Sequence, residues 1–489
     1  EEVLARELTE LGASNIEIGR RMVSFTGDKA LMYKANFCLR TAIRILKPIK
    51  HFTAKTADEV YDAVKAIAWE EYLDNMSSFA VDAVVFSNEF RHSKFVAYKV
   101  KDAIVDYFRE KTGNRPSVRI SNPDLAINIH IAEDQCTLSL DSSGESLHRR
   151  GYRQEQVEAP LNEVLAAGMI LMTGWRGECD LIDPMCGSGT IPIEAALIAR
   201  NIAPGIFRKE FGFEKWKDFD QNLLDSIYND DSQEREFTHK IYGYDNNPRA
   251  NEIATHNVKA AGVSKDVILK IQPFQQFEQP KEKSIIITNP PYGERISSGD
   301  LLELYKMIGE RLKHAFTGND AWILSYRDEC FDQIGLKASV KIPLFNGALE
   351  CQFRQYQLFD GKYKAFRSEN AGKDFKPRRN TDSPRPKTRS FSRDGEQKGF
   401  RKKEDRPSGS RKNEGFRKEE GFRGRKAGDG KEFTRERRNE FRFKDESKPR
   451  TPRPSTDDGR PKQAPGPRYM HSRRKPEIER ENNESMDKQ

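Results

Sequence analysis

The most informative stretch for the fold is residues 183–190, which read Asp183-Pro184-Met185-Cys186-Gly187-Ser188-Gly189-Thr190. They follow a strand-like stretch, 179–182, and precede a helical pattern that begins at Ile191. A glycine-rich turn between a strand and a helix lets a ligand approach the backbone, and the helix start offers free N–H groups. The stretch departs from GxGxxG, which argues against a standard dinucleotide site, and it lacks the Gly-Lys-Ser/Thr of a P-loop. By itself the turn fits any nucleotide, or a tight turn without a ligand.

A second motif, Asn289-Pro290-Pro291-Tyr292-Gly293, comes directly after the apolar residues 285–287. In an open α/β sheet the loops at the carboxyl ends of the strands meet over one crevice, so both motifs can face one ligand. The Asn289 carboxamide oxygen and the Pro290 carbonyl are two acceptors that can hold an amino group by both N–H bonds. Tyr292 adds a flat face on which a base can stack. The alternative is a proline-rich turn with a surface tyrosine.

A third motif, Tyr244-Asp245-Asn246-Asn247-Pro248, ends another strand-like stretch. An acidic residue in that position commonly accepts hydrogen bonds from ribose hydroxyls. Asp245 is equally well placed to cap the helix that follows. The spacing alone does not decide between the two roles.

The segment around these motifs alternates helix and strand. Helices are expected over 161–172, 191–200, 251–261 and 301–316, and strands over 181–183, 241–244, 267–271, 285–288 and 321–325. Residues 338–343 and 350–359 read as a hairpin. This alternation predicts an α/β fold with a doubly wound, mostly parallel sheet, to which the hairpin adds an antiparallel edge.

Two smaller α/β pieces, residues 1–50 and 51–150, precede this segment. In the first we expect a strand over 15–25 and a helix over 31–46, closed by Pro48. In the second, helices over 57–72 and 95–110 and strands over 79–86, 127–131 and 136–140 are expected. A basic connector, Leu147-His148-Arg149-Arg150-Gly151-Tyr152-Arg153, leads into the segment 151–362.

The charge is divided unevenly along the 489 residues. The chain has 84 Lys+Arg and 76 Asp+Glu, a net charge of +8, but residues 366–489 alone carry +15 and the preceding 365 residues −7. The segment 366–489 contains no Leu, Val or Trp, so residues 363–489 are predicted to be a disordered basic tail. Its three Gly-Phe-Arg repeats (399–401, 415–417 and 421–423) interleave rings with cations, as in sequence-tolerant RNA-binding segments. A soluble spacer is the alternative.

Several protein classes can be set aside. No stretch approaches the ~18 apolar residues of a transmembrane helix, and no signal-peptide pattern is visible at the start of the sequence. Six cysteines without a CxxC pair argue against a zinc ribbon or a disulfide framework. We therefore expect a cytoplasmic protein without a membrane contact, a metal or an evident obligate protein partner.

In combination, these motifs resemble the class I S-adenosylmethionine-dependent methyltransferases that act on exocyclic amino groups of bases. The junction 139–153, followed by Ala159-Pro160-Leu161, resembles the boundary between THUMP and catalytic domains in bacterial 23S ribosomal RNA guanine-N2 methyltransferases. Asn201-Ile202-Ala203-Pro204-Gly205 is also similar to that family. The resemblance, over residues 1 to about 362, implies a ferredoxin-like piece (1–50), a THUMP-like RNA-binding domain (51–150) and a Rossmann-like methyltransferase domain (151–362) with an antiparallel last strand.

The resemblance also implies roles for residues. The S-adenosylmethionine site would comprise the loop residues and a ribose-binding acid, namely Asp183, Gly187, Ser188, Gly189, Thr190 and Asp245. Asn289, Pro290 and Tyr292 would form the catalytic target-base site. Family members usually place an acidic residue after the third strand to meet the adenine, whereas this chain offers Gln272 or Gln275 there.

RNA capture would fall to residues 1–150 and to the connector. Its basic residues His148, Arg149, Arg150 and Arg153 are candidates for phosphate contacts, with a solvated linker as the alternative. The expected reaction is methyl transfer to the N2 amino group of a guanine in 23S ribosomal RNA. Rivals are a transfer-RNA guanine-N2 methyltransferase, a DNA amino-methyltransferase and a non-catalytic ribosome-assembly factor. The THUMP-like region argues against DNA, and the intact loop 289–292 argues against a protein that only binds RNA.

Overall fold

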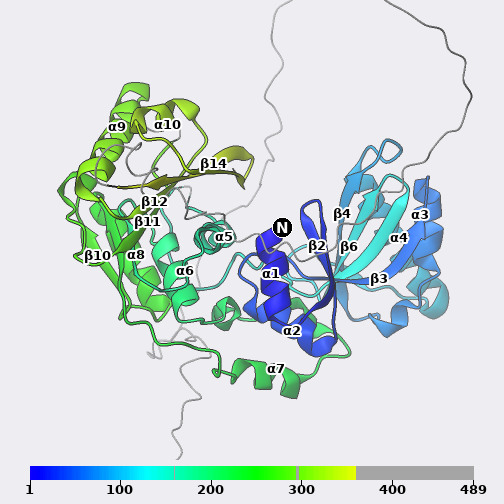
Figure 1. The fold of residues 1–489 in the computed structure, drawn as a ribbon. Helices are drawn as coiled ribbons and strands as arrows, with labels where there is room; N and C mark the ends of the chain where they lie inside the picture. Colours follow the sequence, from blue (N-terminus) through cyan, green and yellow to red (C-terminus); the bar gives the residue numbers. More distant parts are fainter. Residues whose placement is uncertain (159, 293–296, 360–489) are drawn as a thin grey trace, which may run out of the picture. The chain divides into compact units, whose positions relative to one another are not determined.

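The computed structural model describes residues 1–158, 160–292 and 297–359 (Figure 1). The predicted tail, 363–489, lies outside the described residues, as do Ala159 and Gly293 of the predicted motifs. The described strands form three sheets, of two, five and seven strands.

The seven-stranded sheet has the order β10-β9-β8-β11-β12-β14-β13. Its strands are β8 (Asp180–Asp183), β9 (Ile241–Asp245), β10 (Val267–Ile271), β11 (Ser284–Thr288), β12 (Asp320–Ser325), β13 (Val340–Asn346) and β14 (Leu349–Gln357). Neighbours from β10 to β12 pair in parallel, while β14 pairs antiparallel with both β12 and β13. This confirms the doubly wound sheet with an antiparallel edge.

Helices cover both faces of this sheet, because its central strands are apolar on both sides. They are α5 (Glu163–Thr173), α6 (Thr190–Ala199), α8 (Pro248–Ala260), α9 (Ser298–Ala315) and α10 (Asp328–Ile334). In β11, Ile286 belongs to the core cluster that contains α9 and α10, whereas Ile285 and Ile287 belong to the cluster that contains α5 and α6. Alternate residues of one strand therefore enter two separate hydrophobic layers.

The five-stranded sheet has the order β3-β7-β6-β4-β5. Its strands are β3 (Leu46–Thr53), β4 (Ser78–Phe86), β5 (Ser117–Val118), β6 (Leu125–Ala132) and β7 (Gln135–Asp141). Helices α3 (Ala57–Lys65) and α4 (Ser93–Thr112) contact each other, and α4 packs on β4 (Figure 1). Pro48 does not close the first piece as predicted, since it lies within β3 beside a register shift. An edge strand tolerates proline because one side of its backbone is unpaired.

Two further predictions, both for the N-terminal piece, are wrong in their boundaries. The single strand expected over 15–25 is a hairpin of β1 (Ser14–Gly19) and β2 (Met22–Thr26), whose turn places Arg21 at a left-handed φ of 60°. The helix expected over 31–46 ends early, as α2 (Lys29–Cys38). The reason is Glu7 in α1 (Glu2–Glu10), whose carboxylate accepts the backbone N–H groups of Arg40 (2.8 Å) and Thr41 (3.1 Å). The sequence pattern also missed α7 (Gln221–Tyr228) and α10.

Candidate active site

The predicted cofactor loop and the predicted target-base loop are joined by one buried hydrogen bond. Residues 183–190 connect β8 to α6, and β8 pairs with β11, which leads into Asn289. The Asp183 carboxylate accepts a hydrogen bond from the Thr288 hydroxyl (2.8 Å) and one from the Met185 N–H (3.3 Å). Burial raises the pKa of Asp183 to about 7 against the effect of both bonds, and the charge of Asp245 adds to the rise. The two motifs thus meet at the carboxyl ends of adjacent strands.

Asp245 faces the cofactor loop and does not cap the next helix. Its carboxylate accepts the N–H groups of Gly187 (3.0 Å) and Asn247 (2.8 Å). The cap of α8 is Asn247, whose side chain accepts the N–H groups of Arg249 (2.9 Å) and Ala250 (3.4 Å). An ionised carboxylate has about four acceptor positions, so Asp245 retains capacity for a ligand hydroxyl.

In the target-base loop, Asn289 presents an unsatisfied acceptor. Its side-chain oxygen is buried and has no hydrogen-bond partner among the described residues. Tyr292 is buried too; its hydroxyl accepts a bond from the Asn346 amide (2.7 Å), and its ring packs edge-on against Tyr326 at 5.5 Å. Burial raises the pKa of Tyr292 to about 12, so the phenol stays protonated at neutral pH. A buried unpaired acceptor costs about 1–3 kcal/mol, which a donor on a ligand would offset.

The adenine-side residues are less distinctive. The Gln272 backbone N–H donates to Asp245 O (2.9 Å), which places Gln272 directly beside the predicted ribose-binding acid. Its side-chain amide donates to Gln276 O (2.7 Å), and Gln275 is exposed. The role of Gln272 at the adenine stays a prediction.

In the connector, the prediction that Arg150 contacts RNA phosphate is wrong. Its side chain is 2% exposed, lies 3.4 Å from Glu194 and donates to Leu147 O (2.9 Å). Arg149 is 67% exposed and pairs with Glu145 (2.6 Å), so it stays a candidate. His148 is half-buried and hydrogen-bonded to Ser146 (2.8 Å), and burial lowers its pKa.

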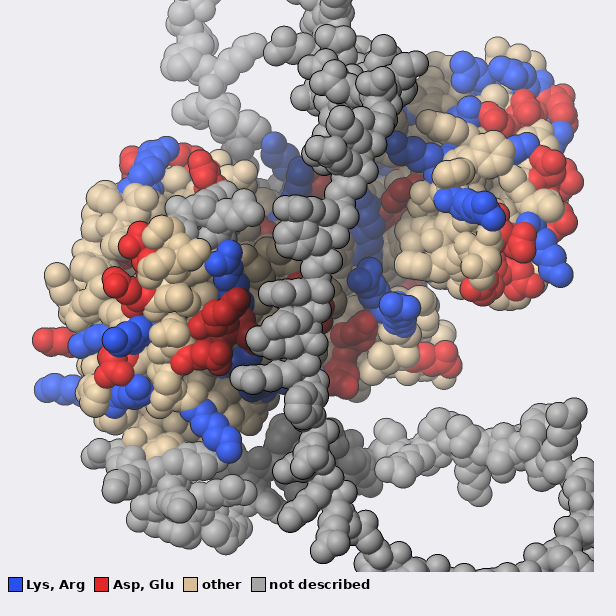
Figure 2. Space-filling model, turned by 90° about the horizontal axis from the view of Figure 1, so that it is seen from above, with Lys and Arg blue, Asp and Glu red and all other residues tan. Residues whose placement is uncertain are grey.

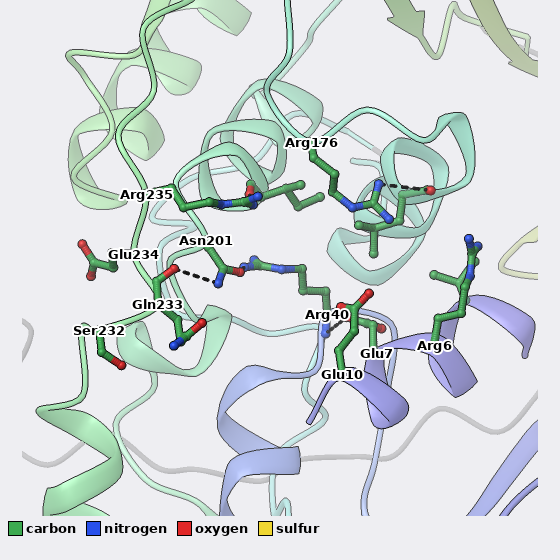
Figure 3. A pocket seen from close by; sticks show the side chains of 13 residues that line it. Arg6, Glu7, Glu10, Arg40, Arg176, Asn201, Ser232, Gln233, Glu234 and Arg235 are labelled. Carbon is green, nitrogen blue, oxygen red and sulfur yellow. Dashed lines mark hydrogen bonds between the residues drawn. The ribbon is translucent and has the colours of Figure 1, made fainter. Parts of the chain in front are cut away.

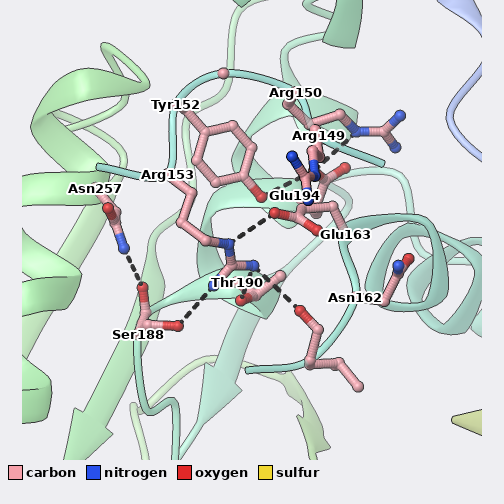
Figure 4. Close-up of polar contacts among 12 residues, drawn as sticks. Arg149, Arg150, Tyr152, Arg153, Asn162, Glu163, Ser188, Thr190, Glu194 and Asn257 are labelled. Atoms are coloured by element: carbon pink, nitrogen blue, oxygen red, sulfur yellow. Dashed lines mark hydrogen bonds and ion pairs between the residues drawn. The ribbon is translucent and has the colours of Figure 1, made fainter. Parts of the chain in front are cut away.

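The Arg153 side chain also points into the protein, where its guanidinium is hydrogen-bonded to the side chains of the cofactor loop (Figure 4). It donates to the hydroxyls of Ser188 and Thr190, both at 2.9 Å. It also donates to Leu161 O (3.1 Å) and pairs with Glu163 (2.7 Å) at the start of α5. With 14% of its side chain exposed and all of these bonds made, Arg153 is not available to RNA phosphate. The hydroxyls of Ser188 and Thr190 are used here, so a cofactor would meet the backbone N–H groups of these residues.

Asn257 is a second support that the sequence pattern missed. This buried residue of α8 donates to Ser188 O (3.1 Å) and Glu155 O (3.0 Å), and it accepts the Gln154 N–H (2.8 Å). Arg153 and Asn257 thereby fix residues 153–155 against the cofactor loop. The only signal in the sequence is an asparagine inside a helix, where asparagine is intrinsically unfavourable.

Comparison with known proteins identifies the family. A family model described as "RMKL-like, methyltransferase domain" matches residues 150–355, a THUMP domain model matches 54–141, and an RlmL ferredoxin-like domain model matches 1–46. The "Putative RNA methyltransferase slr0064" of Synechocystis is 38% identical over 362 residues, covering 73% of this chain and 94% of that protein. This chain belongs to the RMKL-like methyltransferase family.

Other RMKL-like relatives are longer. A "Ribosomal RNA large subunit methyltransferase K/L" of Syntrophotalea carbinolica is 40% identical over 377 residues, which are 74% of this chain and 53% of that protein. The chain thus spans about half the length of the K/L relatives that it matches. Among solved structures, SMU.472, "a putative methyltransferase complexed with SAH", is 32% identical with a TM-score of 0.66, covering 74% of this chain and 96% of that one.

The RMKL-like site fits S-adenosylmethionine, the cofactor of this fold. Its ribose hydroxyls and its ammonium group are hydrogen-bond donors, and the carboxylates of Asp183 and Asp245 are acceptors at the carboxyl ends of β8 and β9. A Cβ at Gly189, which has a φ of 81°, would approach Ala254 to 3.2 Å, so glycine allows this loop to pack closely on α8. In the described part of the chain, no group of His, Cys, Asp or Glu side chains could hold a metal ion, and no helix is long and apolar enough to cross a membrane.

A separate cavity of about 510 Å³ lies near the other end of α6 (Figure 3). Two of its four arginines bond carbonyl groups at the ends of helices: Arg176 donates to Leu171 O (3.3 Å) and Arg235 to Ile198 O (2.8 Å). Cations favour helix C-termini because carbonyl groups there lack partners. The ten residues of α6 separate this cavity from the cofactor loop by roughly 15 Å, so it is distinct from the RMKL-like site.

Proposed function

We propose that this protein transfers a methyl group from S-adenosylmethionine to the exocyclic N2 amino group of a guanine in 23S ribosomal RNA. The observation that carries the proposal is the buried Asn289 oxygen, which lies beside the cofactor loop and has no hydrogen-bond partner among the described residues. An amino group has two N–H donors, one for this oxygen and one for the adjacent Pro290 carbonyl. The relatives named large subunit methyltransferase K/L support ribosomal RNA as the substrate.

The chemistry requires activation of a weak nucleophile, because the lone pair of a guanine amino group is delocalised into the ring. When bound, S-adenosylmethionine supplies an electrophilic methyl group on a sulfonium. Asn289 Oδ1 and the Pro290 carbonyl would accept the two N–H bonds, localise the lone pair on nitrogen and aim it at the methyl carbon. In this transfer the N–C bond would form as the C–S bond breaks, and the amino proton would leave to water. Alignment and preorganised acceptors supply most of the rate.

A guanine inside a helix must leave its stack to reach this loop. The face of Tyr292 would receive the extruded base, because the bond from Asn346 and the packing of Tyr326 fix the ring. Figure 2 shows acidic and basic side chains interspersed over the face that it presents. RNA capture by residues 1–365, with their net charge of −7, would therefore depend on local contacts.

The test is methyl transfer by the full chain to 23S ribosomal RNA that lacks its natural modifications. We expect transfer by the native protein and at least a hundredfold loss in Asn289→Ala, roughly the effect of removing one preorganised catalytic hydrogen bond. Cofactor affinity should persist in the variant. Methyl groups appearing only on transfer RNA or DNA would overturn the substrate, and failure to bind S-adenosylmethionine would overturn the activity.

A further inference from the structure

The tip of the β13–β14 hairpin presents an aromatic ring to solvent, one residue before the side chain that contacts the target-base loop. Asn346, the last residue of β13, donates to the Tyr292 hydroxyl (2.7 Å). The preceding residue, Phe345, points to the opposite face of the strand and is 55% exposed. The hairpin is therefore anchored to the loop that would hold the base, while its ring faces outward.

A second hairpin contributes a cation to the same ring. Arg21, in the turn between β1 and β2, has its guanidinium carbon 5.8 Å from the centre of the Phe345 ring. Arg20 and Arg21 are both exposed, and the backbone N–H of Arg21 donates to the Glu1 carboxylate (2.8 Å), which stabilises the turn. Further exposed apolar residues on the two hairpins are Ile18, Met22 and Leu349. We call the cation and the ring, Arg21 and Phe345, the hairpin patch; the three apolar residues are not part of it.

The hairpin patch suits a nucleobase better than a phosphate. Its neighbourhood has nearly balanced charges, with Arg20, Arg21 and Lys341 against Glu17 and Glu350, and Glu350 is the cross-strand partner of Phe345. A balanced field attracts polyanions weakly. Flat rings and guanidinium planes, in contrast, stack unpaired bases of single-stranded RNA. Single exposed apolar residues are common, but this ring lies next in sequence to the residue that bonds Tyr292, and an arginine lies over it.

We propose that the hairpin patch binds the nucleotide adjacent to the target guanine, with its base stacked on Phe345 and in contact with Arg21. This inference rests on the proposed function, because it needs a single-stranded RNA segment whose guanine enters the Asn289 loop. Extruding a base costs stacking energy. A neighbour stacked on Phe345 would offset part of that cost and fix which guanine faces Asn289.

The test compares Phe345→Ala with Phe345→Tyr and Leu349→Ala in steady-state methyl transfer to unmodified 23S ribosomal RNA. Loss of one stacked base raises the KM for RNA about tenfold, and we expect this for Phe345→Ala with kcat within about twofold of the native value. Phe345→Tyr keeps a ring and should restore the native KM. Leu349→Ala removes a similarly exposed apolar side chain from the same hairpin without removing a ring, so its KM should stay native. Affinity for S-adenosylhomocysteine should be equal in all four proteins.

The outcomes separate this inference from the proposed function. If the native protein transfers methyl groups and Phe345→Ala has the same KM for RNA, the proposed role of the hairpin patch is wrong while the proposed function stands. An equal rise in KM in Leu349→Ala would also overturn it, since the effect would then come from the fold of the hairpin. Transfer by the native protein to no RNA would overturn the proposed function, and the patch with it. Transfer to another RNA would overturn only the 23S assignment, and the same KM comparison would then be made on that RNA.

Discussion

The variant Arg153→Lys tests whether Arg153 positions the cofactor loop or contacts RNA. The native guanidinium bonds the hydroxyls of Ser188 and Thr190 at 2.9 Å and pairs with Glu163, whose side chain is 7% exposed. Alanine would leave the Glu163 charge buried and unpaired at a cost of about 3–5 kcal/mol, enough to unfold a marginal domain. Lysine keeps that ion pair but cannot reach both hydroxyls with one ammonium group.

The expected effect follows from the bond that lysine loses. A hydrogen bond to a charged group contributes about 1.5 kcal/mol or more, which corresponds to roughly tenfold in an equilibrium constant. We therefore expect Arg153→Lys to weaken S-adenosylhomocysteine binding about tenfold in calorimetric titrations, with RNA affinity unchanged. Arg149→Lys is the matched control, because Arg149 is exposed and contacts no part of the cofactor loop in the bonds described. Unchanged cofactor affinity with weakened RNA binding in Arg153→Lys would contradict a role of Arg153 in positioning the cofactor loop. It would support the original prediction that Arg153 contacts RNA phosphate.

Four further predictions concern buried groups and charge. The pKa of Asp183 is near 4 in the unfolded chain and about 7 in the folded protein. The free energy of unfolding should therefore fall as pH rises through this range. Urea unfolding should show this slope for the native protein and not for Asp183→Asn. Because a cationic cofactor favours the ionised form, the affinity of the native protein for S-adenosylmethionine should rise from pH 6 to 8, and equal affinity at both values would contradict this. Asn257→Ala leaves Ser188 O and the Gln154 N–H without this partner and should destabilise the protein by about 2 kcal/mol; a loss below about 0.5 kcal/mol would contradict its supporting role. Truncation near residue 366 should lower both RNA affinity and its salt dependence while cofactor affinity stays constant, and unchanged RNA binding would reduce the tail to a spacer.

Much of the methyltransferase sheet was predictable because its strands are short apolar runs bounded by turns. The predicted strand 267–271 is identical to β10, and the hairpin at the sheet edge was expected within a few residues. The N-terminal piece was harder, because tertiary contacts decide its boundaries. Glu7 ends α2 through Arg40 and Thr41, which are more than 30 residues away in sequence.

The connector shows why charge alone misassigned two arginines. Sequence displays a basic run but not its partners, and Glu194 and Ser188 lie 44 and 35 residues from the arginines that they bind. One signal was available: Glu194 is the single charged residue of the otherwise apolar α6. A buried carboxylate in such a helix requires a cation or a hydrogen-bond donor, which Arg150 and Tyr152 supply. For Asp245 the spacing fitted both a ribose-binding residue and a helix cap. The structure excludes the cap, because Asn247 caps α8.

The most direct measurement is the methylated nucleoside itself. Unmodified 23S ribosomal RNA would be incubated with S-adenosylmethionine and either the native chain or Asn289→Ala, then digested to nucleosides and analysed by mass spectrometry. We expect N2-methylguanosine with the native protein and at least a hundredfold less with Asn289→Ala, at equal cofactor affinity. A different methylated nucleoside, or undiminished N2-methylguanosine from Asn289→Ala, would contradict this expectation.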